Sequence, residues 1–135
     1  MIIDFSRTRL CTWDENEPNH IKNALKEMKS IINSASFNRS LPITLDLEGN
    51  YLEDEGVRMV CEFIQGYEIL KKNLKVIDIS NNRFTGNSLA NIQILIEVCD
   101  LKLLNLSINY LSVEDVRNLR KRLGEASAIV KYSCV

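Results

Sequence analysis

Short stretches in which apolar and polar residues alternate recur along the chain, and a longer stretch with helical spacing follows each of them. The three copies read LPITLDLEGNYL (41–52), LKVIDISNNRF (74–84) and LKLLNLSINYL (101–111). In each copy two aliphatic residues stand one apart, two variable positions follow, and then come an asparagine and, two positions on, another apolar residue. Alternation with a period of two predicts a short strand with one buried face. A unit that returns at this spacing predicts a repeat architecture.

The asparagines Asn50, Asn82 and Asn109 stand where each predicted strand ends. The side-chain amide of asparagine bonds readily to backbone groups in turns. When the units stack, these side chains would satisfy loop backbone groups that point into the interior. We therefore expect a structural ladder of asparagines.

A helix is predicted after each copy, because the apolar residues there recur on one helical face. Ser112 and Asp115 predict the N-terminal cap of the last helix. One such unit cannot bury its own apolar face, whereas stacked units can. The predicted inward faces are Val57, Val60, Cys61 and Ile64; Ile92, Leu95, Ile96 and Cys99; and Val116, Leu119 and Leu123.

The repeated frame resembles the leucine-rich repeat, LxxLxLxxNxL. The long helix-bearing units and the run LEDEGV (52–57) resemble its ribonuclease-inhibitor-like class. The resemblance covers residues 41–123 most strongly. It implies an α/β fold: a short leucine-rich-repeat solenoid, with a curved parallel β-sheet on the concave face, α-helices on the convex face, and a role in protein binding.

The flanks are predicted to be degenerate units of a single domain, 1–135. Residues 1–40 form a degenerate N-terminal repeat, in which Thr8 replaces the asparagine and a helix falls within 18–35. Residues 41–123 form three regular repeats, and 124–135 form a closing segment with a terminal strand in 128–135. We expect about four repeats plus that strand. The unequal spacing of the copies predicts insertions in the outer loops, especially at 34–40.

Composition and the few reactive residues argue against catalysis, nucleic-acid binding and membrane insertion. The net charge is −1, and lysine and arginine do not gather on one predicted face. No apolar run reaches the length of a membrane span, and the N-terminus lacks a secretory-signal pattern. The single histidine, His20, begins a helix without a nearby nucleophile pair. We expect no enzyme, no cofactor and no metal site.

Two groups of carboxylates are better explained by the helix dipole than by acid–base chemistry, because both precede or open predicted helices. They are Asp14, Glu15 and Glu17, and Glu53, Asp54 and Glu55.

The cysteines show no CxxC pair, and Cys61 and Cys99 fall on inward helix faces, where a free thiol acts as a small apolar group. Reduced thiols are favoured over disulfides, which predicts an intracellular, cytoplasmic setting. The four cysteines are Cys11, Cys61, Cys99 and Cys134.

The variable strand positions would form columns on the concave surface, and these are the candidate partner-binding residues. The first column is Asp4, Asp46, Asp78 and Asn105; the second is Ser6, Glu48, Ser80 and Ser107; the third is Arg7, Gly49, Asn81 and Ile108. Neighbouring strands lie about 4.8 Å apart, so the stacked aspartates repel one another. Either a basic partner compensates for that repulsion, or the face is simply solvated and the repulsion screened.

A second candidate contact lies on the rim where strand turns to helix. Tyr51 and Tyr110 directly follow their asparagines, and Arg83 fills that position in the middle copy. Aromatic residues dominate binding energy at interfaces, and Trp13 is a further possible anchor. The alternative is that these side chains only pack over the turns.

The sequence thus predicts a non-catalytic module that binds a partner protein through its concave strand face. Two alternatives stay open. One is a bacterial effector acting in a host cell, which the resemblance and the composition, rich in Ile, Asn and Lys, suggest. The other is a self-assembling structural module that uses exposed solenoid ends.

Overall fold

The computed structural model describes residues 1–13 and 20–133. Within them the chain forms a mixed α/β fold with a five-stranded parallel sheet in the order β1-β2-β3-β4-β5. The strands are β1 (Ile2–Asp4), β2 (Ile43–Asp46), β3 (Leu74–Asp78), β4 (Leu103–Asn105) and β5 (Val130–Lys131). The three predicted internal strands are confirmed, and so is a closing strand within 128–135.

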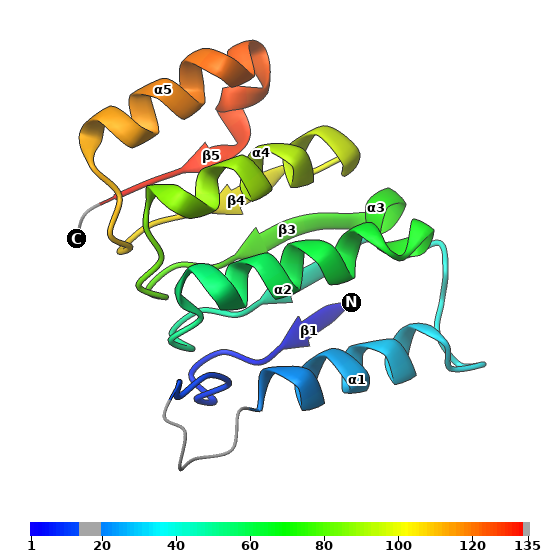
Figure 1. The fold of residues 1–135 in the computed structure, drawn as a ribbon. Helices are drawn as coiled ribbons and strands as arrows, with labels where there is room; N and C mark the ends of the chain where they lie inside the picture. Colours follow the sequence, from blue (N-terminus) through cyan, green and yellow to red (C-terminus); the bar gives the residue numbers. More distant parts are fainter. Residues whose placement is uncertain (14–19, 134–135) are drawn as a thin grey trace.

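Helical segments connect successive strands. They are α1 (Ile21–Ile32), α2 (Glu53–Gln65), α3 (Glu68–Asn73), η1 (Gly86–Ser88), α4 (Leu89–Val98), α5 (Val113–Leu123) and η2 (Gly124–Ile129). Parallel neighbours need crossover connections of one hand, so a sheet in sequential order receives its helices on one face. Figure 1 shows α1, α2, α4 and α5 along the same side of the sheet. The other face, which we call the open face, carries the variable strand positions.

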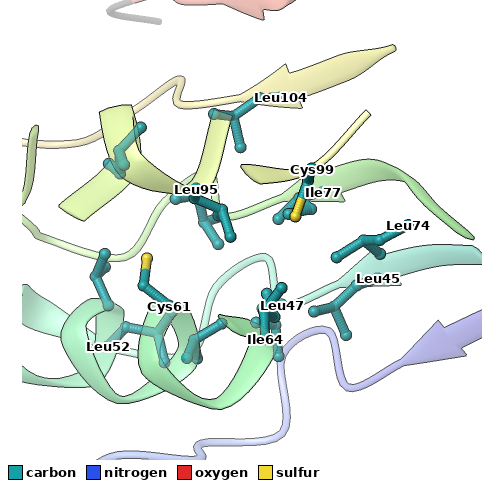
Figure 2. Packing of buried hydrophobic residues seen from close by; sticks show 14 of the residues in the cluster. Leu45, Leu47, Leu52, Cys61, Ile64, Leu74, Ile77, Leu95, Cys99 and Leu104 are labelled. Carbon is teal, nitrogen blue, oxygen red and sulfur yellow. The ribbon is translucent and has the colours of Figure 1, made fainter. Parts of the chain in front are cut away.

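The core is the layer between the sheet and the helices. Leu45, Ile77 and Leu104 are paired across neighbouring strands and fully buried. The predicted inward faces of α2 and α4 are buried, and on α5 Leu123 is only partly so. Figure 2 shows side chains from strands and helices meeting in this layer, with Cys61 and Cys99 among them. None of the helices in the described residues is long and apolar enough to cross a membrane.

Two features of the connections were not predicted. The short helix α3 lies between α2 and β3, and Asn73 at its end donates from Nδ2 to the carbonyls of Arg39 (2.5 Å) and Leu41 (3.2 Å). Asn73 thereby fastens the loop between α1 and β2, the part of the chain where insertions were expected. The 3₁₀ segments η1 and η2 were also missed, because such short turns leave little periodicity.

The first turn of α2 carries Glu53, Asp54 and Glu55, but the helix dipole is not the whole explanation for them. Asp54 accepts hydrogen bonds from the backbone N–H of Thr85 (2.8 Å), the Thr85 hydroxyl (2.7 Å) and the Ser88 hydroxyl (2.6 Å). Burial alone would raise the pKa of Asp54, but these hydrogen bonds together hold it below its usual range. Asp54 therefore joins its helix to η1 of the next unit. Asp14, Glu15 and Glu17 lie outside the described residues.

The cap of α5 is confirmed. The Ser112 hydroxyl accepts from the Asp115 N–H, and the Asp115 carboxylate accepts from the Ser112 N–H, both at 3.0 Å. This reciprocal pair satisfies two of the unpaired donors at the helix start.

The asparagines at the strand ends form a continuous hydrogen-bonded ladder. Oδ1 of Asn82 accepts the backbone N–H groups of Asn50 (2.9 Å) and Leu52 (3.2 Å) from the unit before. Its Nδ2 donates to the carbonyls of Leu47 (2.9 Å) and Ser80 (3.0 Å). Asn82 has no exposed surface, so no solvent replaces these bonds.

The same arrangement repeats on either side of Asn82. Asn109 accepts from the N–H groups of Asn82 and Phe84. Asn50 accepts from those of Thr8 and Leu10. Thr8 stands in the ladder position of the first unit, and its hydroxyl donates to the Phe5 carbonyl of its own turn (2.7 Å). The ladder therefore fixes the backbone path at the end of every strand from β1 to β4.

Replacing Asn82 by alanine should lower the free energy of unfolding by about 2–4 kcal/mol, because the buried N–H groups of Asn50 and Leu52 lose their acceptor. The Leu47 and Ser80 carbonyls each keep a second donor. Urea unfolding followed by circular dichroism measures this loss. The neighbouring exposed residue supplies the control: Asn81→Gly should change stability by no more than about 0.5 kcal/mol. Equal effects of the two substitutions would contradict a stabilising role for the ladder.

Candidate interaction surface

The first predicted column lies in register across the sheet. Asp4 pairs with Asp46, Asp46 with Asp78, and Asp78 with Asn105. The register continues to Lys131 of β5, which the sequence did not indicate as a member. A column of three carboxylates, an amide and an exposed lysine therefore crosses the open face.

Each acidic or amide residue of this column has a local structural role that sequence reasoning missed. Its side-chain oxygen accepts the backbone N–H two residues further on, which closes an Asx turn at the strand end. The bonds run from Ser6 to Asp4 (2.8 Å), from Glu48 to Asp46 (3.1 Å), from Ser80 to Asp78 (2.9 Å) and from Ser107 to Asn105 (3.1 Å). The recurrence of Asp and Asn at this position follows from the turn.

The environment of Asp46, the middle one of the three aspartates, is unfavourable to a negative charge. Burial raises the pKa of Asp46 and the charges of Asp78 and Asp4 raise it further, against the stabilising N–H of Glu48. At the edge of the sheet, the Ser6 hydroxyl and N–H lower the pKa of Asp4. The repulsion inferred from the sequence therefore adds to the effect of burial at Asp46.

The second predicted column is only half available to a partner. Ser6 and Glu48 are partly exposed, but Ser80 and Ser107 are buried, with 6% and 5% of their surface exposed. The prediction that both serines present outward contacts is wrong, because their hydroxyl groups are buried and hydrogen-bonded within the structure at the strand ends. The Ser80 hydroxyl donates to Asp78 (2.6 Å), and the Ser107 hydroxyl accepts the N–H of Ser133 (3.0 Å).

The third column is the most accessible of the three. Arg7, Asn81 and Ile108 are exposed, and Gly49 is partly exposed. Arg7 donates from Nε and Nη2 to the two carboxylate oxygens of Glu48, both at 3.0 Å. This two-pronged pair links the second and third columns between neighbouring units.

The residue before each ladder position has a left-handed backbone conformation, and so has the residue after the first three. Before it these are Arg7, Gly49, Asn81 and Ile108, and after it Arg9, Tyr51 and Arg83, with φ between 51° and 71°. This conformation directs the N–H of Asn50 and that of Leu52 toward the same Oδ1 of Asn82. Glycine adopts the conformation without steric cost, yet it occurs at only one of these positions.

The predicted rim residues lie on these same turns. The Arg83 guanidinium carbon stands 4.4 Å from the centroid of the Tyr51 ring, which is a cation–π contact. Tyr110, 64% exposed, is bridged through its backbone to Thr85 and donates its N–H to the Phe84 carbonyl (2.9 Å). Trp13 donates its indole N–H to the Tyr51 carbonyl (2.8 Å). Trp13, Tyr51 and Arg83 are thus brought together.

A surface hollow of about 280 Å³ opens beside these rim residues. It is lined by Arg9, Cys11, Thr12, Trp13, Tyr51, Glu53 and Arg83. Sequence reasoning did not group Arg9 and Thr12 with Glu53, because they belong to the first and second units and meet only when the turns stack.

The thiols and the histidine show no catalytic arrangement in the described part of the chain. Cys11, Cys61 and Cys99 are free and buried, and burial raises their pKa values to about 12, about 12 and about 11. Such thiols stay protonated and unreactive near neutral pH. His20 is exposed at the start of α1. Cys134 lies outside the described residues, which contain no cluster of His, Cys, Asp and Glu able to hold a metal ion.

Comparison with known proteins supports the class suggested by this geometry. The family model of the Leucine Rich Repeat matches residues 73–95, which begin just before β3 and extend into α4. No curated protein matches the chain. The match and the parallel sheet support a leucine-rich repeat, a motif that generally serves as a protein-interaction module.

Replacing Ile108 by asparagine should stabilise the protein. Ile108 has φ of 55° and is 47% exposed, and a left-handed conformation costs about 1–2 kcal/mol for an ordinary side chain but less for asparagine. We expect a gain of about 1 kcal/mol in thermal or urea unfolding. Ile108→Val, which keeps the branched side chain, should bring no gain. A loss of stability on Ile108→Asn would contradict the strain argument.

Removing the charge of Asp46 should stabilise the fold at neutral pH. Because the folded state raises the pKa of Asp46, the ionised carboxylate destabilises the fold above that pKa, and this cost disappears toward about pH 4. Asp46→Asn keeps the turn acceptor. It should add a few tenths to about 1 kcal/mol at pH 7, and thermal unfolding at a series of pH values should show the gain shrinking with acid.

Asp54→Asn provides the opposite control. Since its pKa is lowered in the folded protein, this substitution should lose stability at pH 7, and the loss should diminish as the pH falls through the folded pKa. A pH-independent effect at Asp46 would contradict the assignment of strain to its charge.

Proposed function

We propose that the protein is a non-catalytic interaction module of the ribonuclease-inhibitor-like class, a solenoid whose concave surface is the open face of the sheet. It binds a partner protein there, through a basic segment that lies along the column of Asp4, Asp46 and Asp78. Asn105, the exposed residues Arg7 and Asn81, and the half-exposed Ser6 and Glu48 complete the contact area. The rim of Tyr51, Arg83 and Tyr110 borders it.

One comparison within the column carries the proposal. Asn105 closes its turn with the same hydrogen-bond length, 3.1 Å, as Asp46 does. An amide therefore suffices for the local structure, and the negative charge of Asp46 is not needed for the turn. The charge instead raises the energy of the free protein, as the elevated pKa of Asp46 indicates.

A basic partner would offset the destabilisation caused by the ionised Asp46 in the free protein. Lysine or arginine side chains placed over the column would relieve the repulsion between the carboxylates and speed association. A preformed sheet also avoids the cost of ordering a flexible binding site. The negative charge of the aspartates would thus serve recognition of the partner, while their side-chain oxygen atoms accept the hydrogen bonds of the turns.

Self-assembly through the ends of the sheet is a second candidate, favoured by apolar hollows there. Met1, Ile31 and Phe37 line one beside α1, and Val113 and Tyr132 line another beside α5. Contact between unlike ends would produce open head-to-tail assemblies. A cytoplasmic location, and delivery into a host cell as an effector, remain hypotheses that rest on the sequence.

The variant Asp46→Asn/Asp78→Asn tests the leading proposal while keeping both turn acceptors. We would capture partners from the native cell extract, purify the principal one and measure its affinity by calorimetry. The double variant should bind about tenfold more weakly, since one decade corresponds to about 1.4 kcal/mol, and the difference should shrink with added salt.

Glu97→Gln/Glu125→Gln is the matched control, because it removes the same charge from exposed positions away from the open face and from both apolar hollows. It should leave the affinity unchanged. Undiminished binding by the Asp46/Asp78 variant would refute the acidic-column proposal. Self-association at the sheet ends would survive both double variants, which separates the two candidates.

A further inference from the structure

The hollow beside the rim is cationic, whereas the aspartate column of the open face is acidic. Arg9 and Arg83 both line it, and both side chains are exposed. Among the described residues no carboxylate forms an ion pair with either of them. A neighbouring hollow of about 230 Å³ shares Arg9 and Tyr51 and adds Arg7, whose guanidinium is already paired with Glu48.

Arg83 is held in a geometry suited to a planar anion. Its guanidinium lies over the Tyr51 ring, 4.4 Å from the centroid, and a stacked guanidinium keeps its N–H edges available. The same chain shows what such an edge binds, because Arg7 forms a two-pronged bond to Glu48 with both distances 3.0 Å. Within the described part of the chain, Arg83 and Arg9 have the same chemistry without such a partner.

The wall of the hollow is fixed and partly apolar. The indole of Trp13 is anchored by its 2.8 Å bond to the Tyr51 carbonyl. The buried hydroxyl oxygen of Thr12, also in the lining, has no hydrogen-bond partner among the described residues. An unpaired buried hydroxyl is costly, and a bound polar group would satisfy it.

The charge balance selects the kind of anion. Among the described residues that line the hollow, Glu53 is acidic and Arg9 and Arg83 are basic, so their formal charges sum to about +1. A single carboxylate would neutralise this charge, whereas a phosphate carries about −1.5 to −2 at neutral pH and would be repelled by Glu53.

We propose that this hollow, the Arg9–Arg83 hollow, receives a side-chain carboxylate from an acidic segment of the partner protein. The inference rests on the proposed function, because it adds a second contact of opposite sign to the same partner. The partner would then place basic residues over the aspartate column and an acidic residue beyond the strand ends. That pairing would fix the direction in which the partner lies across the sheet.

Trp13 allows a direct test, since it is the only tryptophan in the chain and lines the hollow. Titration with hexaglutamate should change the tryptophan emission in a saturable way, and salt should weaken the binding. Arg9→Gln/Arg83→Gln should raise the half-saturation concentration at least about tenfold. Circular dichroism would verify that this variant is folded.

Lys29→Gln/Lys121→Gln removes the same charge from exposed helix positions and should leave the titration within about twofold. An unchanged titration of the arginine variant, or no emission change with hexaglutamate, would overturn the proposal. Tighter binding of a phosphoserine peptide than of hexaglutamate would overturn the assignment to a carboxylate. The Asp46→Asn/Asp78→Asn variant should still bind hexaglutamate, so the two proposals can fail separately.

Discussion

The buried asparagine ladder is the constraint on which the rest of the structure depends. Each strand ends inside the molecule, where its turn would leave backbone donors and acceptors away from water. Asn50, Asn82 and Asn109 satisfy those groups across the unit boundary as well as within their own unit. Unpaired backbone N–H and C=O groups away from water raise the free energy of the folded state, so the ladder fixes the conformation of the turns. The turns in turn set the positions of the side chains that they carry.

Recognition properties follow from this fixed frame. Left-handed conformations occur on both sides of Thr8, Asn50 and Asn82, and those positions carry Arg7, Arg9, Tyr51 and Arg83. Side chains from separate units therefore meet at the strand ends. On the open face the same regularity places like charges in register at Asp4, Asp46 and Asp78. In a scaffold of stacked units, side chains at equivalent variable positions therefore lie next to one another on the surface.

The sequence predicted the strands, the helix faces and the cap of α5, because period and capping chemistry are local signals. It could not predict that Ser80 and Ser107 are buried, since their cover comes from neighbouring turns and strands. It also missed the hydrogen bonds of Asp54 to the next unit and the grouping of Arg9 with Arg83. Such features depend on how units stack, which single-unit patterns do not encode.

The ladder also has a direction. Asn82 receives the N–H groups of the unit before it and donates to Leu47 of that unit, and Asn109 does the same for the unit of Asn82. The strand-end turns of the first three units are therefore each bonded by the asparagine of the unit that follows. Losing the carboxyl-terminal unit would strip partners from the one before, and the loss would propagate toward the amino terminus. Fraying in this protein is thus intrinsically asymmetric.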